Sequence, residues 1–217
     1  MLPLLAALHA SLCAASDVQG GNTTAVAALI DRVVGVGGSA SFVLQLDPQL
    51  AGCQSPVNEC VALANLPGGK IGIAATSLPS LGFGVGTYLR SSCNASLTWV
   101  KTGGLNARCK PGALPPVRKD AAHIYERSVK WTYYQNVVDS SYSFVWWDAA
   151  RWRTEVDWMS LIGINIALVY TGQEKVLLAL YKQFGVDLTN TSGNLDYFNG
   201  PAYLSWSRGQ SQAGVGG

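Results

Sequence analysis

The chain has 217 residues, of which 48% are hydrophobic and 13% are charged. This composition excludes an intrinsically disordered chain and allows one large or two small domains with a buried core. The net charge of +2 and the absence of any run of five basic residues argue against nucleic acid as a partner.

The N-terminus predicts a targeting segment. Residues 2–15 are almost entirely apolar and end in small residues that suit cleavage after Ala15. They are too short to span a membrane, which takes about 20 residues. No Lys or Arg lies near Met1, so a misassigned start or a buried helix is the alternative interpretation. We expect residues 1–15 to be a signal peptide, with no membrane span in the chain.

The N-glycosylation pattern agrees with export. It occurs three times, at Asn22, Asn94 and Asn190. Each occurrence alone is weak, because the tripeptide is common by chance. We expect all three asparagines to be glycosylation sites.

The cysteines point to an oxidising compartment. Without the signal peptide an even set remains: Cys53, Cys60, Cys93 and Cys109. The most local pairing joins Cys53 to Cys60 and Cys93 to Cys109. Three pairings are possible, and the sequence does not choose among them.

No metal or cofactor is expected. The chain has no Cys-x-x-Cys pair, and its histidines are His9 and His123. Structural zinc usually needs four closely spaced Cys or His ligands. A catalytic Cys–His pair is equally unsupported.

The first half predicts a small α+β domain over residues 16–110. Its predicted helices are 24–34, capped by Thr24 and ended by Gly35, and 81–90. Its predicted strands are 41–46, 69–74 and 95–100, with a cysteine-bearing loop at 50–65. Residues 111–129 begin with three prolines and a glycine and predict a linker.

The second half predicts a parallel βαβα unit. The predicted elements are a strand at 130–138, a helix at 148–161, a strand at 164–170 and a helix at 173–184. The spacing of Trp152, Val156 and Met159 indicates a core-facing stripe, and the second strand is apolar enough to be buried on both faces. Residues 209–217 are expected to be a flexible tail.

Residues 133–148 carry the best clue to function. Aromatic residues alternate there with amides, hydroxyls and carboxylates. Flat rings cover the apolar faces of a sugar, and fixed polar groups bind its hydroxyls. A strand that ends in such a cluster and leads into a helix is also how a barrel enzyme places its site.

These residues resemble a known family. The collinear segments are Tyr133-Tyr134-Gln135-Asn136-Val137, Ser141-Tyr142-Ser143-Phe144-Val145-Trp146-Trp147-Asp148 and Gly200-Pro201-Ala202-Tyr203-Leu204-Ser205-Trp206. They are similar to the start of the catalytic barrel in lysosomal-type α-N-acetylglucosaminidases, glycoside hydrolase family eighty-nine. The first half resembles the family's N-terminal α/β domain in outline only.

The resemblance implies the fold class α/β. A small α+β N-terminal domain would precede the first βα units of an incomplete TIM-type (β/α)8 barrel, at residues 130–208. Eight such units take about 250 residues, so this chain has room for two. The missing C-terminal part of the same enzyme is then an implied partner.

The resemblance also implies a reaction. The enzyme would remove terminal α-linked N-acetylglucosamine from heparan-type glycans by a retaining mechanism with two carboxylates about 5 to 5.5 Å apart. No residue of this chain matches the family's two catalytic glutamates, so the chain alone is expected to be inactive. The alternatives are a secreted non-catalytic glycan-binding protein and an inactive truncated isoform.

Six residues are candidates for substrate binding. By the resemblance, Asn136 hydrogen-bonds the sugar and Trp206 packs against it, while Tyr142 is a weaker candidate, together with its neighbours Trp146 and Trp147. Glu174 follows a barrel strand, but Thr171 and Glu174 also fit a capping box.

Three carboxylates are expected to be structural. Asp148 would cap its helix, and Glu155 and Asp157 lie in the helix interior.

The implied partners and location follow from the same reading. The partner is a glycan with terminal N-acetylglucosamine, and homo-oligomers are compatible with the family. The secretory pathway leads to lysosomal, vacuolar or extracellular destinations, which share one entry signal.

Overall fold

A computed structural model describes residues 22–55, 58–119, 124–136, 138–139, 142–144, 146–168 and 173–186. The chain divides into two compact units. The first comprises Met1–Thr132 and Trp152–Asn165, and the second comprises Tyr133–Arg151 and Ile166–Gly217. The signal peptide and the tail predicted at the two ends lie outside the described residues.

Helix α2 (Thr24–Val33) is the first element among the described residues of the first unit. Its buried residues are Val26, Leu29 and Ile30, as its apolar stripe predicts. The chain leaves the helix through Gly35, whose φ of 127° favours glycine. The prediction that Thr24 caps the helix is wrong, because Thr24 is its first residue and donates its N–H to Asn22 Oδ1 at 3.0 Å.

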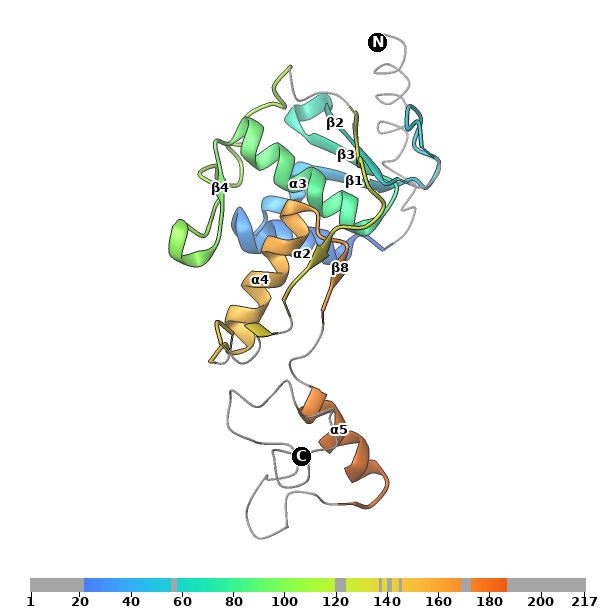
Figure 1. Cartoon of the computed structure of the whole chain (residues 1–217). Coiled ribbons are helices and arrows are strands. Elements are labelled where there is room, and N and C mark those ends of the chain that lie inside the picture. The colour runs from blue at the N-terminus through green and yellow to red at the C-terminus, as the bar shows by residue number, and fades with distance from the viewer. Residues whose placement is uncertain are drawn as a thin grey trace. The chain divides into compact units, whose positions relative to one another are not determined.

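A four-stranded sheet forms the centre of the first unit (Figure 1). Its strands, in spatial order, are β1 (Phe42–Leu46), β3 (Ile71–Ala75), β2 (Cys60–Asn65) and β6 (Ile124–Glu126). Strand β1 runs parallel to β3, whereas β2 is antiparallel to both of its neighbours.

The residues of strand β2 were predicted to belong to a loop at 50–65, and for them that prediction is wrong. It is buried along its length up to Asn65. Its sequence, CVALAN, shows no alternation of apolar and polar residues and contains two alanines, which have low strand propensity. Only the neighbouring strands on both sides make this segment a strand.

Helix α3 (Leu78–Ser92) packs against the sheet (Figure 1). It starts three residues earlier than the predicted 81–90, because Ser77 caps it by accepting the N–H of Ser80 at 3.2 Å. Its glycines permit close packing on two sides. A Cβ on Gly84 would lie 2.6 Å from Val61 of the sheet, and one on Gly86 would lie 1.9 Å from the carbonyl oxygen of Leu161.

The smaller elements of the first unit complete the chain path. They are the 3₁₀-helices η1 (Gly38–Ser41), η2 (Pro67–Gly69) and η3 (Val100–Thr102) and the short strands β4 (Ser96–Leu97) and β5 (Leu105–Asn106). The strand predicted at 95–100 is therefore reduced to the two residues of β4, which pair antiparallel with β5.

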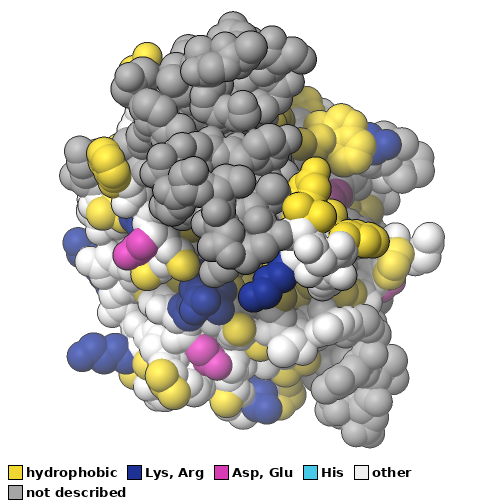
Figure 2. All heavy atoms as spheres, turned by 90° about the horizontal axis from the view of Figure 1, so that it is seen from below, with side chains coloured by type: hydrophobic (Ala, Val, Ile, Leu, Met, Phe, Trp, Pro, Cys, Tyr) yellow, Lys and Arg dark blue, Asp and Glu magenta, His cyan; other side chains and the backbone are white. Residues whose placement is uncertain are grey.

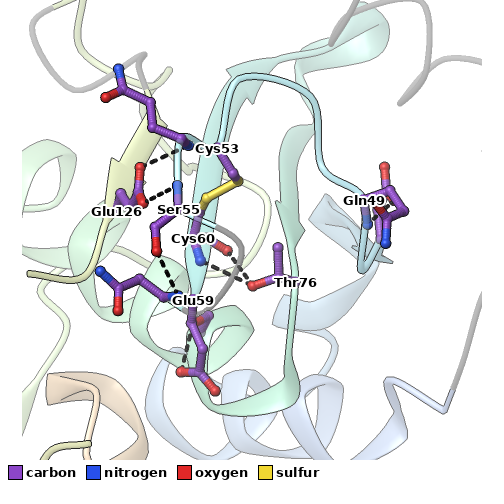
Figure 3. Close-up of a disulfide and its surroundings, with 11 residues drawn as sticks. Gln49, Cys53, Ser55, Glu59, Cys60, Thr76 and Glu126 are labelled. Carbon is purple, nitrogen blue, oxygen red and sulfur yellow. Dashed lines mark hydrogen bonds between the residues drawn. A yellow bond between two sulfur atoms is a disulfide. The ribbon is translucent and has the colours of Figure 1, made fainter. Parts of the chain in front are cut away.

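Both disulfides of the most local pairing are present, Cys53–Cys60 and Cys93–Cys109. The first ties the loop after β1 to the start of β2 (Figure 3). The carboxylate of Glu126 accepts the N–H groups of Gln54 and Ser55 from the same loop, at 3.0 and 2.7 Å. This loop is thus fixed to the sheet both covalently and by hydrogen bonds.

The segment 111–129, predicted as a linker, contributes to the first unit. Val117 is buried in the core, and its backbone makes two hydrogen bonds with the side chain of Asn65, at 2.7 and 3.0 Å. The hydroxyl of Tyr88 donates to the carbonyl oxygen of Pro115 at 2.6 Å. Strand β6 then joins the sheet. A proline-rich segment can therefore pack against a hydrophobic core as well as form a linker.

The second unit contains β7 (Tyr133–Tyr134), β8 (Ile166–Ala167) and α5 (Gln173–Gln183), and α4 (Ala149–Ile162) contributes residues to both units. The predicted order of strand, helix, strand and helix is present, and β7 pairs with β8 in parallel. Both strands are shorter than predicted. Strand β8 is exposed, although its sequence predicted a strand buried on both faces.

The buried face of α4 differs from the predicted stripe. Val156 is 53% exposed, so its predicted place in the core is wrong. Met159 is buried as predicted, and the other buried residues are Glu155, Asp157 and Leu161. Two carboxylates lie on this face because polar partners from the N-terminal sheet domain compensate them, which hydrophobic periodicity does not show.

Candidate functional site

The candidate site begins where β7 and β8 end. Parallel strands end at the same edge of a sheet, and ligands of α/β folds bind beyond that edge. The pairs are Tyr133 with Ile166 and Tyr134 with Ala167, and the N–H of Leu168 donates to the carbonyl oxygen of Tyr134 at 2.9 Å.

Asn136 lies two residues beyond β7 and is exposed. Its side-chain oxygen accepts the N–H of Val138 at 2.9 Å, and its backbone oxygen accepts the N–H of Asp139 at 3.2 Å. The side-chain oxygen therefore shapes the turn, as an amide does in an Asx-turn. The amide nitrogen makes no hydrogen bond with a described residue, so it is a free donor for a ligand hydroxyl or carbonyl.

The loop between β7 and α4 is held by its own backbone. The carbonyl oxygen of Asp139 accepts the N–H groups of Tyr142 and Phe144, at 3.1 and 2.9 Å, and that of Phe144 accepts the N–H of Trp147 at 2.9 Å. Asp148 caps α4 as predicted, accepting the N–H of Arg151 at 2.8 Å. The loop therefore presents its side chains from a defined backbone.

The aromatic candidates separate into two groups. Trp147 packs within the loop, with its ring centroid 3.9 Å from that of Phe144 and the guanidinium of Arg151 3.8 Å over its face. Tyr142 and Trp146 are 61% and 87% exposed. A structural role thus fits Trp147, whereas Tyr142 and Trp146 keep ring surface that a sugar can cover.

Gln135 was not identified from the sequence. It is buried, with 5% exposure, and its side-chain oxygen has no hydrogen-bond partner within the described residues. It follows β7 directly and neighbours Asn136. An amide next to a candidate ligand residue is the only sequence signal for it, and that signal does not predict burial.

Other predicted residues lie outside the described part of the chain. Trp206, Asn190 and Thr171 are among them, and Glu174 is described only as part of helix α5, without its side chain. Of the other predicted glycosylation sites, Asn22 and Asn94 are exposed. Asn94 has a φ of 49°, a left-handed conformation that asparagine tolerates.

The two interior carboxylates of α4 are structural, as predicted. Asp157 receives two bonds from the guanidinium of Arg32, at 2.8 and 2.6 Å, and these raise the pKa of Arg32 above its ordinary value. Glu155 accepts the indole N–H of Trp99 at 3.2 Å. Both carboxylates serve the packing of α4 and are not free for chemistry.

Neither a metal centre nor a membrane helix occurs in the described residues. They contain no group of three or more His, Cys, Asp or Glu side chains that suits a metal ion. Among the helices with described positions, none is long and apolar enough to cross a bilayer.

Two models of one family match the chain. The model of the α-N-acetylglucosaminidase (NAGLU) N-terminal domain matches residues 24–116, and that of the TIM-barrel domain of the same family matches residues 132–217. The α-N-acetylglucosaminidase of Homo sapiens is 36% identical over 184 residues, which cover 85% of this chain and 23% of the human protein.

Solved structures that are similar to this chain belong to the same family as the two family models. The family 89 glycoside hydrolase from Clostridium perfringens in complex with PUGNAc has a TM-score of 0.69 and 26% identity, over 98% of this chain and 23% of that protein. A variant of the same enzyme with two glutamates replaced by glutamine, in complex with its substrate GlcNAc-α-1,4-galactose, has a TM-score of 0.68 and 25% identity.

The sheet of the first unit and the βαβα order that follows it define an N-terminal α/β domain and the beginning of a TIM barrel of a glycoside hydrolase. The chain belongs to the α-N-acetylglucosaminidase family, glycoside hydrolase family 89. It spans 23% of the length of the relatives it matches.

Proposed function

We propose that this chain supplies the N-terminal domain and the first sugar-binding strand of an exo-acting α-N-acetylglucosaminidase. The observation that carries the proposal is the coincidence of the family match with a free amide and exposed rings just beyond β7. The substrate class is a glycan that ends in α-linked N-acetylglucosamine.

In this proposal Asn136 uses its free amide nitrogen to bind the sugar. Tyr142 and Trp206 offer ring faces, and Glu174 is a further substrate contact. The exposed amide of Asn136 and the exposed ring of Tyr142 support these roles. For Trp206 and Glu174 the support is the family resemblance alone.

The reaction itself would use two carboxylates outside this chain. One attacks the anomeric carbon as a nucleophile, and the other acts first as acid and then as base, so that the configuration is retained. The complex of a relative with two glutamates replaced and its substrate bound supports a pair of essential carboxylates.

The glycan attached to the N-acetylglucosamine is the finer part of the proposal. The relative from Clostridium perfringens acts on GlcNAc-α-1,4-galactose, and heparan-type glycans are the substrate that the resemblance implies here. Both present the same terminal sugar, so the pocket residues named above would serve either one. Comparing turnover of the two glycans distinguishes them.

A secretory destination fits the same enzyme. Disulfides persist in oxidising compartments, and two are present. The exposure of Asn22 and Asn94 is compatible with glycosylation at both. We propose a lysosomal, vacuolar or extracellular location after entry through a signal peptide over residues 1–15, and leave homo-oligomers as a compatible state.

The first test is kinetic. The enzyme that contains this chain should hydrolyse an α-N-acetylglucosaminide, and the 217-residue chain alone should not. NMR of the first product should show the α-anomer, because retention preserves the α configuration of the bond. A β-anomer would contradict the retaining mechanism, and turnover by the chain alone that Glu174→Gln abolishes would place the catalytic acid at Glu174.

The second test concerns the pocket. Asn136→Ala should lower kcat/KM about tenfold or more, which is the loss of about 1.4 kcal/mol expected for one hydrogen bond to the transition state. Trp131→Ala is the matched control, because Trp131 is an exposed ring in the first unit. Equal losses in both variants would reject the assigned pocket. If the sequenced native transcript ends after Gly217, binding of the sugar by the chain, measured by calorimetry, decides between a glycan-binding protein and an inactive isoform.

A further inference from the structure

A cluster of polar side chains lies in the first unit. We call it the junction cluster, and it consists of Glu59, Ser80, Arg127, Thr132 and Asn165. Glu59 Oε2 lies 2.8 Å from Arg127 Nε, accepts the hydroxyl of Ser80 at 3.0 Å, and accepts the amide of Asn165 at 3.5 Å. Figure 3 shows Glu59 beside Cys60, at the start of β2.

Arg127 connects the sheet with two later segments. Its backbone N–H donates to the carbonyl oxygen of Glu59 at 2.9 Å, directly after β6. Its Nη1 donates to the hydroxyl of Thr132 at 2.9 Å, and its Nη2 donates to the carbonyl oxygen of Gly163. One guanidinium thus holds the chain on both sides of α4.

Asn165 joins the same two segments to each other. Its Oδ1 accepts the N–H of Thr132 at 2.8 Å, and its backbone N–H donates to the carbonyl oxygen of Thr132 at 3.2 Å. Its Nδ2 also donates to the carbonyl oxygen of Lys130 at 2.8 Å. The bonds between Asn165 and Thr132 thus resemble one further residue pair of the strands, directly before the pairing of β7 with β8 begins.

These bonds lie directly before the two strands of the second unit. Thr132 is followed at once by Tyr133, the first residue of β7, and Asn165 is followed at once by Ile166, the first residue of β8. The strands have two residues each, so their own ladder specifies the register only weakly. A slip by one residue would turn each side chain to the opposite face.

We propose that the junction cluster is a positioning device. Through it the N-terminal domain sets the register of β7 against β8 and so aims Asn136, which lies at most about 13 Å of extended chain beyond Thr132. The inference that Asn136 is aimed at a sugar rests on the proposed function. The inference that the cluster sets the register of β7 against β8 does not. Arg127, Thr132 and Asn165 act through the strands and need not contact the substrate.

A matched pair of substitutions separates this role from simple stabilisation. Thr132→Val keeps the branched shape but removes the acceptor for Arg127, and Thr132→Ser restores it. The control is Arg32→Ala, which breaks the ion pair with Asp157 and leaves the entry to both strands intact. Asn165→Ala is the stronger variant and removes three of the bonds described above.

The first readout is amide hydrogen exchange of the 217-residue chain by NMR. Leu168 reports on the register, because its N–H donates to Tyr134 across the strand pair. Thr132→Val and Asn165→Ala should speed exchange at Leu168 at least about tenfold relative to Leu63 in β2, while Thr132→Ser and Arg32→Ala should not. Unchanged exchange at Leu168 in Asn165→Ala, or an equal change in Arg32→Ala, overturns the proposal.

The second readout is the steady-state kinetics of the enzyme that contains this chain. Thr132→Val should lower kcat/KM about tenfold, since small displacements of a positioned group are costly, and Thr132→Ser should restore it. Arg32→Ala should lower the melting temperature and leave kcat/KM of the folded enzyme unchanged. A loss in Arg32→Ala as large as in Thr132→Val overturns the positioning of Asn136. If the wild type hydrolyses no α-N-acetylglucosaminide, the proposed function fails, and the exchange result still decides the role of the cluster.

Discussion

The two units of this chain differ in how their strands are stabilised. In the first unit, β2 and β3 have five or six residues, pair on both sides and are almost wholly buried. In the second, β7 and β8 have two residues each, and both residues of β8 are exposed. Two disulfides lie in the first unit.

Exposed apolar side chains occur in both units. In the second unit, helix α5 exposes Val176 and Leu180, Phe184 is exposed directly after it, and the loop after β7 exposes Tyr142 and Trp146. Hydrophobic side chains also reach the described surface on the face shown in Figure 2. The difference lies in the buried residues: both hydrophobic core clusters of the described residues belong to the first unit, whereas the second carries the residues proposed to meet the ligand.

The largest effect on stability is expected at the contact of α3 with α4. In Gly86→Ala the new Cβ would lie 1.9 Å from the carbonyl oxygen of Leu161, which is backbone and cannot rotate away. We expect a loss of about 3 kcal/mol in urea unfolding, in spite of the better helix propensity of alanine. Gly82→Ala is the matched control, because its Cβ would meet the rotatable hydroxyl of Ser160 at 2.0 Å and a backbone oxygen, that of Ser160, only at 3.2 Å. An equal loss in the control would refute the explanation.

The ion pair between α2 and α4 is expected to contribute less. In Arg32→Ala, Asp157 stays behind with 6% of its side chain exposed and without its guanidinium partner. We expect a loss of about 2 kcal/mol, below the value for a fully buried pair because the Arg32 side chain is 38% exposed. The test is a double-mutant cycle with Asp157→Asn, and strictly additive losses would show that the pair is not coupled.

Tyr88 links stability to alkaline pH. Its hydroxyl donates to Pro115, and burial raises the pKa of Tyr88 above its ordinary value of 10.0. The folded chain therefore keeps the phenol neutral, and stability falls as the pH rises above about 10, where the unfolded chain ionises. Tyr88→Phe should cost about 1 kcal/mol at pH 8 and reduce the further loss at pH 11.

The control for this pH dependence is Tyr133→Phe, since Tyr133 is largely exposed. Unfolding free energies of both variants at pH 8 and pH 11 provide the measurement. The interpretation fails if Tyr133→Phe reduces the alkaline loss as much as Tyr88→Phe does.

The smallest effect on stability is expected in the second unit. Tyr142→Ala should change the free energy of unfolding by less than about 0.5 kcal/mol, because the side chain is mostly exposed. Phe144→Ala removes a buried ring that packs against the ring of Trp147 and should cost clearly more. Thermal melts compare the two. A large loss in Tyr142→Ala would show that its ring is structural and not free for a sugar.

Local chemistry explains which elements were predictable. Helix α2 follows from its apolar stripe and Gly35, and α4 follows from Asp148 at its start and Gly163 after its end. The parallel βαβ order was likewise accessible from the sequence. These features depend on residues close together in the chain.

Features that failed prediction depend on distant partners. The strand β2 needs β3 and β6 on its two sides, and the segment around Val117 needs Asn65. The buried carboxylates of α4 need Arg32 and Trp99. The pattern of residues within each of these segments does not indicate which distant residues it contacts.

The sequence by itself determined the family, the strand–helix–strand–helix order of the second half and the aromatic segment that follows the first barrel strand. It left three cysteine pairings open, and the tertiary structure shows the most local one. Only the tertiary structure decided that α4 docks on glycines of α3 and that Arg127 and Asn165 hold the entries to β7 and β8. The physical reason is that a close backbone approach and a buried hydrogen bond each involve two segments. The local sequence of neither segment determines how far apart the two lie in space.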